Sequence, residues 1–386
     1  MVLGAPFTRR HQVSAALPEF VPGQQLSQLF YHGAVRPILD RRLPGLAHSA
    51  GWLGTGSDAL GFDTPRSMDH HWGPRLQLFV AEDQFSEQFA AELHDLLADE
   101  LPLDVHGFPT HFHAANPATH TVYMAPTSQR PVNHMVLVTT TRRFLRGYLG
   151  VDPLDQTLSP AEWLSIPEQL LRTVTSGAVH HDGTGELARV RHALQWYPHD
   201  VWLYILAAQW RRIEQEEPFV GRAAEAGDEL GSQVLAARLA RELMHLCLLM
   251  ARQYAPYSKW LGTAFSRLSC AAELTPSLSG ACSAASYAER EAHLAAAYRH
   301  IAALHNARGL TEPLPTEPAY FFGRPYLVIH ADRFAEALRA AITDPAVQRL
   351  PLHLGSLSQW ADSTDILSDP SWFARLRQCV YTTTPA

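Results

Sequence analysis

The sequence contains very little lysine. Only one of its 386 residues is a lysine, Lys259, so arginine supplies nearly all of the positive charge. Acidic residues outnumber basic ones by 38 to 31, and the formal net charge is −7. Proteins that bind the phosphates of DNA or RNA need clustered cations on their surface. This composition therefore argues against nucleic acid as a partner.

Cysteine and long hydrophobic runs are also scarce. The four cysteines include no CxxC pair and belong to a long chain, a pattern that favours a reduced, cytoplasmic protein. The first 20 residues lack the continuous apolar region of a signal peptide. The most apolar stretch, ELMHLCLLMARQY (242–254), is shorter than the roughly 20 residues that cross a membrane. We therefore expect a cytoplasmic protein without a membrane-spanning helix.

The length of the chain predicts two domains, because 386 residues exceed an ordinary single core. Residues 1–150 mix helical and strand patterns. Helical spacing of apolar residues predicts helices over 23–45 and over 86–101, where Ser86 is a suitable N-cap. Apolar and β-branched residues predict strands at LQLFVAED (76–83), HTVYMAP (120–126) and NHMVLVTTT (133–141). We expect a mixed sheet with helices in this domain.

Helical patterns dominate residues 151–386. Ser159 and Glu162 form a capping box of the S-x-x-E type at the start of one helix. Long amphipathic stretches follow, and RPYLVIHADRFAEALRAAI (324–342) predicts a short strand before a helix. The expected fold class is therefore α+β, with a mainly helical domain after residue 150.

A Gly-rich stretch, GTGSDALGFDTPRSMDHHWGPR (54–75), carries the strongest functional signal. A dinucleotide fingerprint needs G-x-G-x-x-G at the start of a helix, but Gly54, Gly56 and Gly61 are spaced differently. A Walker A loop needs Lys-Ser or Lys-Thr after its last glycine, and Phe62-Asp63 stands there instead. The stretch is therefore neither a Rossmann fingerprint nor a P-loop.

A third pattern fits this stretch better. Gly56-Ser57 follows a short apolar segment, and Asp69 precedes the strand expected at 76–83. A glycine lets the backbone approach a triphosphate, and a serine and exposed amides bind its terminal phosphates. Carboxylates two residues apart on one strand face bind Mg²⁺ for in-line attack at the α-phosphorus. The order of these residues indicates nucleotidyl transfer.

The stretch resembles the signature of the polymerase-β-like nucleotidyltransferase superfamily. In addition, GSDALGFDTPRSMDHHWGPRLQLF (56–79) and YAPYSKWLGTAF (254–265) look similar to the bacterial family catalogued as domain of unknown function 4037. The resemblance implies a nucleotidyltransferase-like N-terminal domain that transfers a nucleoside monophosphate, AMP from ATP, to a small-molecule or protein acceptor. It further implies Mg²⁺ or Mn²⁺ as a cofactor, and it allows a homodimer.

In the site that this resemblance implies, Gly56 and Ser57 bind the phosphates, and Asp69 is the catalytic, metal-binding carboxylate. The superfamily pattern is Asp-x-Asp, but His71 occupies the second position in this chain. An imidazole can bind Mn²⁺ or Zn²⁺ but suits Mg²⁺ poorly. We expect that His71, or an additional carboxylate, completes the metal site.

Asp58, Asp63 and Asp104 are the candidates for that additional carboxylate. Asp58 and Asp63 lie within the Gly-rich stretch, and Asp104 qualifies if it lies on a neighbouring strand. A single aspartate is more often a turn or helix-cap residue, which is the alternative for each of them. Because His71 replaces an acid, a second hypothesis is a degenerate nucleotidyltransferase fold that acts as a nucleotide-binding or regulatory module without catalysis.

Three cations are candidates for contact with the nucleotide. Arg66 and Arg75 belong to the Gly-rich stretch, where either could meet a phosphate. Lys259 lies between Tyr257 and Trp260, whose rings could stack on a base. Aromatic packing between helices is the alternative interpretation of this second group.

Glu216 and Asp228 are candidates for the general base. In the aminoglycoside branch of the superfamily, a carboxylate of the helical domain activates the acceptor hydroxyl. The resemblance transfers that role to Glu216, Glu217 or Asp228. The alternative is a solvated turn in which Asp228 caps the following helix.

Overall fold

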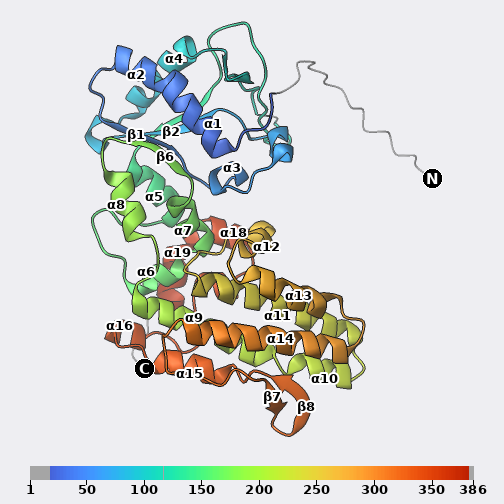
Figure 1. Cartoon of the computed structure of the whole chain (residues 1–386). Helices are drawn as coiled ribbons and strands as arrows, with labels where there is room; N and C mark the ends of the chain where they lie inside the picture. Colours follow the sequence, from blue (N-terminus) through green and yellow to red (C-terminus); the bar gives the residue numbers. More distant parts are fainter. Residues whose placement is uncertain (1–17, 116, 382–386) are drawn as a thin grey trace, which may run out of the picture.

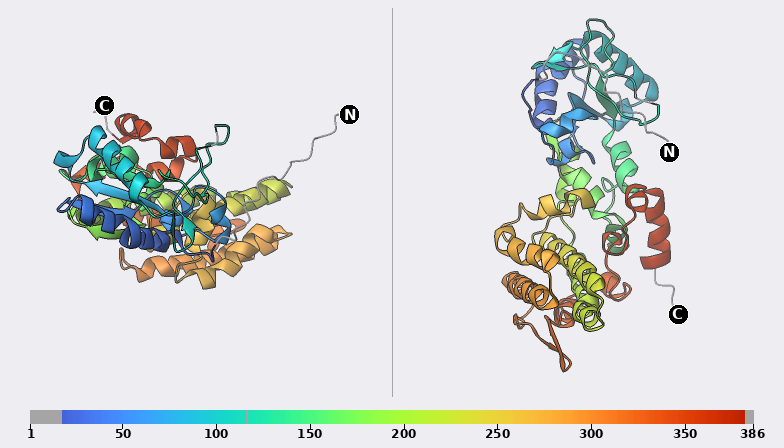
Figure 2. Two further views of the ribbon diagram at one scale, coloured as in Figure 1. Left: turned by 90° about the horizontal axis from the view of Figure 1, so that it is seen from above. Right: turned by 90° about the vertical axis from the view of Figure 1, so that its right-hand side faces the viewer.

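The structure is a computed structural model that describes residues 18–115 and 117–381. The described chain forms two units stacked end to end (Figure 1, Figure 2). One unit contains a four-stranded sheet with helices, and the other consists mainly of long helices. This arrangement confirms the α+β fold class. The prediction that the first 20 residues are not a signal peptide concerns mostly residues 1–17, which lie outside the described part.

The sheet has the strand order β5-β2-β1-β6. Its strands are β1 (His48–Trp52), β2 (Arg75–Val80), β5 (Met135–Thr139) and β6 (Ala178–Asp182). β1 pairs antiparallel with β2 and with β6, whereas β2 pairs parallel with β5. All residues of β2 are buried, as expected for a central strand with an apolar sequence. The end of β1 therefore lies beside the starts of β2 and β5.

Helices pack against this sheet and confirm two predictions. α1 (Gly23–Phe30) continues through a π-helical turn (Tyr31–Val35) into α2 (Arg36–Arg42). α4 (Glu87–Glu100) begins at Ser86, whose hydroxyl accepts a hydrogen bond from the Phe89 N–H at 3.0 Å. The smaller elements of this unit are α3 (Ser57–Leu60), α5 (Thr141–Leu149), β3 (Asp104–Val105) and β4 (Phe108–Pro109).

Two features of this unit differ from the sequence prediction. Residues 120–126 do not form a strand, and only Met124 bridges to Phe112, because the segment ends at a proline and has no continuous neighbour. β6 lies beyond residue 150, where the sequence placed the end of the first domain, yet it pairs with β1. Its sequence, AVHHD, is half polar, so it lacks the apolar pattern that identified β2 and β5.

The second unit is built on three long helices, α9 (His199–Glu216), α11 (Glu229–Met250) and α14 (Tyr287–Ala307). A hairpin of β7 (Ala319–Phe321) and β8 (Arg324–Val328) projects from them (Figure 1), and β8 leads into α15 (Asp332–Ala340) as predicted. The remaining helices are α6 (Pro160–Ser165), α7 (Glu168–Thr175), α8 (Glu186–Ala193), α10 (Phe219–Glu225), α12 (Leu261–Phe265), α13 (Ala271–Ser283), α16 (Pro345–Gln348), α17 (Leu357–Trp360), α18 (Thr364–Ser368) and α19 (Ser371–Leu376).

One hydrophobic cluster joins the two units. It contains Leu53 and Phe79 of the sheet unit together with Trp202 and Leu246 of the long helices. The predicted capping box is present at the start of α6. Within residues 18–115 and 117–381, none of the helices is both long and apolar enough to cross a bilayer.

Candidate functional site

A cavity of about 1020 Å³ opens where the sheet meets the helical unit. The end of β1 and the turn after it form one side, and the starts of β2 and β5 form the floor. The residues Lys259, Trp260 and Thr263 of the helical unit close the opposite side. Small-molecule sites commonly have volumes of about 300–1,000 Å³, so this cavity can hold a ligand of nucleotide size.

The structure brings most of the predicted site residues to this cavity. They line one cavity although they are separated by up to about two hundred positions in the sequence. These residues are Gly56, Ser57, Arg66, Asp69, His71, Arg75 and Lys259.

The Gly56-Ser57 turn follows β1 and leads into α3. Gly56 has an extended backbone, and the side chain of Asp58 folds back against it. A Cβ atom on Gly56 would lie 2.4 Å from Asp58 Oδ1, a distance that requires the structure to shift. Glycine is therefore needed here because of a close approach within the chain, and it leaves the backbone of the turn open on the cavity wall.

Asp58, a candidate from the sequence for the additional metal-binding carboxylate, is instead the ion-pair partner of Arg75. Arg75 Nη2 lies 2.5 Å from Asp58 Oδ2, and the Trp52 indole N–H donates to the same oxygen at 2.9 Å. The guanidinium carbon of Arg75 lies 4.3 Å from the centroid of a Trp52 ring. The Arg75 side chain is therefore fixed in place by a carboxylate and an aromatic face.

Asp69 is the more exposed of the two carboxylates on the cavity wall. It ends the 3₁₀ turn η2 (Pro65–Asp69), and its side chain is 50% exposed. Its Oδ1 lies 2.8 Å from His70 Nδ1. This contact orients the His70 ring, and Asp69 remains accessible from the cavity.

His71 has a left-handed backbone, with φ of 48°, and its N–H donates to the Val122 carbonyl at 2.8 Å. Burial lowers the pKa of His71, and the nearby His70 and Arg75 act in the same direction. The ring is therefore neutral at pH 7 and has a lone pair for a ligand.

Asp63 and Asp104 have structural partners elsewhere. Asp63 Oδ2 accepts hydrogen bonds from the Gly23 N–H at 2.7 Å and from the Trp72 indole at 3.1 Å, so it ties the start of α1 to the loop before β2. Asp104 Oδ1 accepts from the Gly107 N–H at 3.2 Å in the β3–β4 hairpin and does not line the cavity. Both carboxylates therefore have the structural role that the alternative interpretation gave them, as turn or loop residues, and not that of metal ligands.

No metal centre is formed by the side chains of residues 18–115 and 117–381. Among them, no group of three or more His, Cys, Asp and Glu side chains is arranged to hold a metal ion. Asp69 and His71 lie on the same wall, but the other predicted ligands are directed elsewhere. The described residues therefore do not form the carboxylate metal site that the Asp-x-Asp signature implies.

On the opposite wall, Lys259 and Trp260 belong to the 3₁₀ turn η4 (Ser258–Trp260). Trp260 stacks on Phe62, with ring centroids 5.6 Å apart, and Lys259 Nζ lies 5.1 Å from the centroid of a Trp260 ring. Trp260 therefore packs on an aromatic ring of the sheet unit, between a turn and a loop, and not between helices as the alternative interpretation proposed. Lys259 and Trp260 nevertheless face the cavity.

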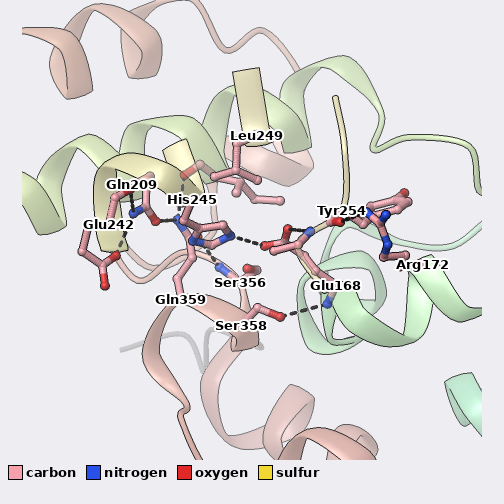
Figure 3. Close-up of polar contacts among 12 residues, drawn as sticks. Glu168, Arg172, Gln209, Glu242, His245, Leu249, Tyr254, Ser356, Ser358 and Gln359 are labelled. Carbon is pink, nitrogen blue, oxygen red and sulfur yellow. Dashed lines mark hydrogen bonds and ion pairs between the residues drawn. The ribbon is translucent and has the colours of Figure 1, made fainter. Parts of the chain in front are cut away.

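A buried polar network holds the segment that leads into this turn (Figure 3). Glu168, at the start of α7, is 1% exposed, and its Oε1 lies 2.8 Å from His245 Nε2. Its Oε2 accepts from the Ala255 N–H at 2.8 Å. Arg172 donates to the Tyr254 carbonyl at 2.8 Å from the next turn of the same helix. The network therefore anchors residues 254–255, four to six positions before Lys259 and Trp260.

The charge of this network is set by its burial and by its pairing. Burial acts to lower the pKa of His245, but the charge and hydrogen bond of Glu168 outweigh it and raise that pKa. Pairing with Glu168 therefore favours the charged form of the His245 imidazole inside the protein. Neither residue was predicted from the sequence, since they are 77 positions apart and no motif contains both.

Glu216 and Asp228 do not lie at the cavity. Glu216 ends α9, and its Oε1 lies 3.0 Å from Arg238 Nη2. Asp228 is the N-cap of α11 and accepts from the Gly231 N–H at 2.8 Å, as the alternative interpretation stated. Both have structural partners, and neither is placed to accept a proton from a ligand in the cavity.

Comparison with known proteins gives a partial match. A family model described as "Domain of unknown function (DUF4037)" matches residues 163–261, which run from α6 to the start of α12. No curated protein matches. A solved structure of a nucleotidyltransferase-like protein from Exiguobacterium sibiricum 255-15 is 8% identical, with a TM-score of 0.30, over 74% of this chain and 77% of that chain. The match to the DUF4037 model confirms, for residues 163–261, the family resemblance that the sequence indicated.

Proposed function

We propose that the protein is a nucleotidyltransferase that binds a nucleoside triphosphate in this cavity and transfers its nucleoside monophosphate to an acceptor. The nucleotide is ATP and the transferred group AMP, and the acceptor is a small molecule or a protein. One observation carries the proposal. The Gly56-Ser57 turn, the cations Arg66, Arg75 and Lys259, and Asp69 all surround a single cavity of nucleotide size.

The two walls supply different parts of nucleotide recognition. The sheet wall offers the open backbone of Gly56 and the fixed guanidinium of Arg75, and both suit phosphate oxygens. The helical wall offers the Trp260 ring, which suits the face of a base, and the ammonium of Lys259. In this orientation the triphosphate lies along β1 and β2, and the base lies toward η4.

The reaction is an in-line displacement. An acceptor hydroxyl oxygen forms a bond to the α-phosphorus, the bond from that phosphorus to the bridging oxygen breaks, and pyrophosphate leaves with the electron pair. The acceptor proton passes to solvent or to a basic group at the cavity. The chain contributes position and positive charge, which are the main protein contributions to phosphoryl transfer.

A divalent ion would have to arrive with the triphosphate, because the described residues supply no cage of their own. Mg²⁺ is commonly held by one or two carboxylates together with substrate phosphates, and Asp69 is the carboxylate on the cavity wall that remains open. Such an ion, Mg²⁺ or Mn²⁺, would neutralise charge on the leaving pyrophosphate.

The test measures nucleotide binding and pyrophosphate release in the purified chain. Calorimetry with the four nucleoside triphosphates should detect binding of at least ATP. Incubation with a panel of small molecules and proteins should release pyrophosphate in the presence of Mg²⁺. Asp69→Asn should reduce that release, whereas Asp83→Asn, on the exposed turn η3 (Glu82–Gln84), serves as the matched control.

Two outcomes would count against transfer. Binding of ATP without pyrophosphate release, across the acceptor panel, would favour a nucleotide-binding module without catalysis. Failure to bind any of the four nucleotides would remove the cavity assignment itself.

A further inference from the structure

The charged side chains of the nucleotide cavity differ from those of a metal-dependent site. Among the residues that line it, the permanent cations are Arg66, Arg75 and Lys259, and the carboxylates are Asp58 and Asp69. Asp58 is already paired with Arg75, and Asp69 contacts His70. Asp58 is therefore neutralised by a permanent cation, Asp69 remains exposed beside His70, and permanent cations outnumber carboxylates by three to two in the lining.

Arg75 lines this wall and is largely buried. The residue is 9% exposed, and its guanidinium pairs through Nη2 with Asp58. Its Nε is enclosed by protein and has no hydrogen-bond partner within the described ranges 18–115 and 117–381. A ligand in the cavity would therefore meet Arg75 through the terminal nitrogens of the guanidinium, not through Nε.

Gly56 lies at the same end of the cavity as Arg75. The site where a Cβ atom of Gly56 would stand lies 2.4 Å from Asp58 Oδ1 and 3.6 Å from Arg75 Nη2, so the Asp58–Arg75 pair packs against this turn. A guanidinium fork suits an oxyanion with several oxygens, such as a phosphate, and Arg66 and Lys259 add permanent positive charge to the lining. An oxyanion that contacts Arg75 competes with Asp58 for the guanidinium.

We propose that the cavity binds the polyphosphate of its nucleotide through Arg75, with Arg66 and Lys259, and that this binding needs no divalent cation. The proposal rests on the nucleotide cavity described above and concerns only the binding step. It follows from the disagreement between the metal site that the Asp-x-Asp signature implies and the residues present, where His71 stands at the second carboxylate position and Asp58 is paired with Arg75.

The first experiment compares binding with and without metal. Calorimetry measures the Kd of ATP, and of inorganic tripolyphosphate, in EDTA and in millimolar Mg²⁺. We expect the two Kd values for each ligand to agree within about threefold, because the cations of the cavity bind the polyphosphate directly and Asp69 would contact an ion only when one is present. Binding that is detected only with Mg²⁺, or that Mg²⁺ tightens by more than about tenfold, overturns the inference.

The second experiment isolates Arg75. Asp58→Asn keeps an oxygen for the Trp52 indole but removes the carboxylate that competes for Arg75, so ATP in EDTA should bind at least as tightly as to the unmodified protein. Adding Arg75→Gln to Asp58→Asn should weaken ATP binding by about 10- to 100-fold relative to Asp58→Asn alone. Equal affinity of the single and double variants overturns the role of Arg75.

Controls separate this inference from the proposed function. Circular dichroism and melting temperature verify the fold of each variant, and Asp83→Asn should bind ATP as the unmodified protein does. The comparison of EDTA with Mg²⁺ uses the unmodified protein, so it decides the question even if the double variant does not fold. Absence of ATP binding under every condition refutes the proposed function, whereas binding that requires Mg²⁺ refutes only the further inference.

Discussion

Replacing Glu168 with glutamine should destabilise the protein strongly, although the two side chains have the same size. Glu168 accepts from His245 and from the Ala255 N–H through its two carboxylate oxygens, both at 2.8 Å. Glutamine offers one carbonyl oxygen, so its NH₂ group would face one of these donors. The change also leaves the charge of His245 without its partner.

The magnitude follows from the burial of this pair. The side chains of Glu168 and His245 are 1% and 7% exposed. Removal of one partner from a buried ion pair typically costs about 3–5 kcal/mol. A glutamine that keeps one of the two hydrogen bonds should fall near the lower end, at about 3 kcal/mol. The volume is unchanged, so a cavity contributes nothing to this figure.

Urea denaturation followed by tryptophan fluorescence measures the change in the free energy of unfolding. Glu336→Gln is the matched control, because Glu336 pairs with Arg339 on the surface and is 58% exposed. An exposed pair of this kind contributes about 0–1 kcal/mol. If Glu168→Gln shifts the free energy of unfolding no more than this control does, the buried Glu168–His245 pair contributes no more to stability than an exposed pair.

Three further predictions concern other parts of the site. Gly56→Ala should abolish or greatly weaken ATP binding in calorimetry, because the new Cβ would lie 2.4 Å from Asp58 Oδ1; unchanged affinity would contradict the tight turn. His245→Gln should lower the melting temperature most below about pH 6.5, because Glu168 raises the pKa of His245 and the paired, charged imidazole stabilises the fold there. The difference in melting temperature between variant and unmodified protein should shrink as the pH rises through that pKa, which melting curves from pH 5 to 9 measure. A difference that grows with pH would contradict the prediction. Glu216→Gln should leave pyrophosphate release unchanged within about twofold, since Glu216 lies outside the cavity, and a large loss in that assay would restore it as a general base.

Local patterns predicted much of the fold. The apolar run in β2, the Ser86 cap of α4 and the Ser159–Glu162 box of α6 are each decided by residues close in sequence. β6 was not predicted as a strand because its stability comes from pairing with β1, while its own side chains include two histidines and an aspartate. The β1–β6 pairing joins residues more than a hundred positions apart, and no local pattern encodes it.

In the candidate site, too, features decided by residues close in sequence were predictable, and features decided by distant contacts were not. The short stretch from Gly56 to Arg75 was sufficient to locate one wall of the cavity, since its residues remain together in space. The partners of individual carboxylates were not predictable in this way. Asp58, rather than Asp63, turned toward Arg75, and Asp63 turned toward the Trp72 indole. These choices depend on how the loop folds over α1, which is a tertiary contact.

The position of β6 at the edge of the sheet has a practical consequence for dividing the chain. A fragment that ends at residue 150 would lack β6 and would leave the backbone groups of β1 on that side unpaired. Exposed strand edges are templates for association with other chains. Such a fragment should aggregate on expression, whereas one extended through α8 would retain the covering strand. A boundary after residue 193 would keep β6 but would still uncover the hydrophobic cluster that joins the sheet unit to the long helices, so the two units are best expressed as one chain.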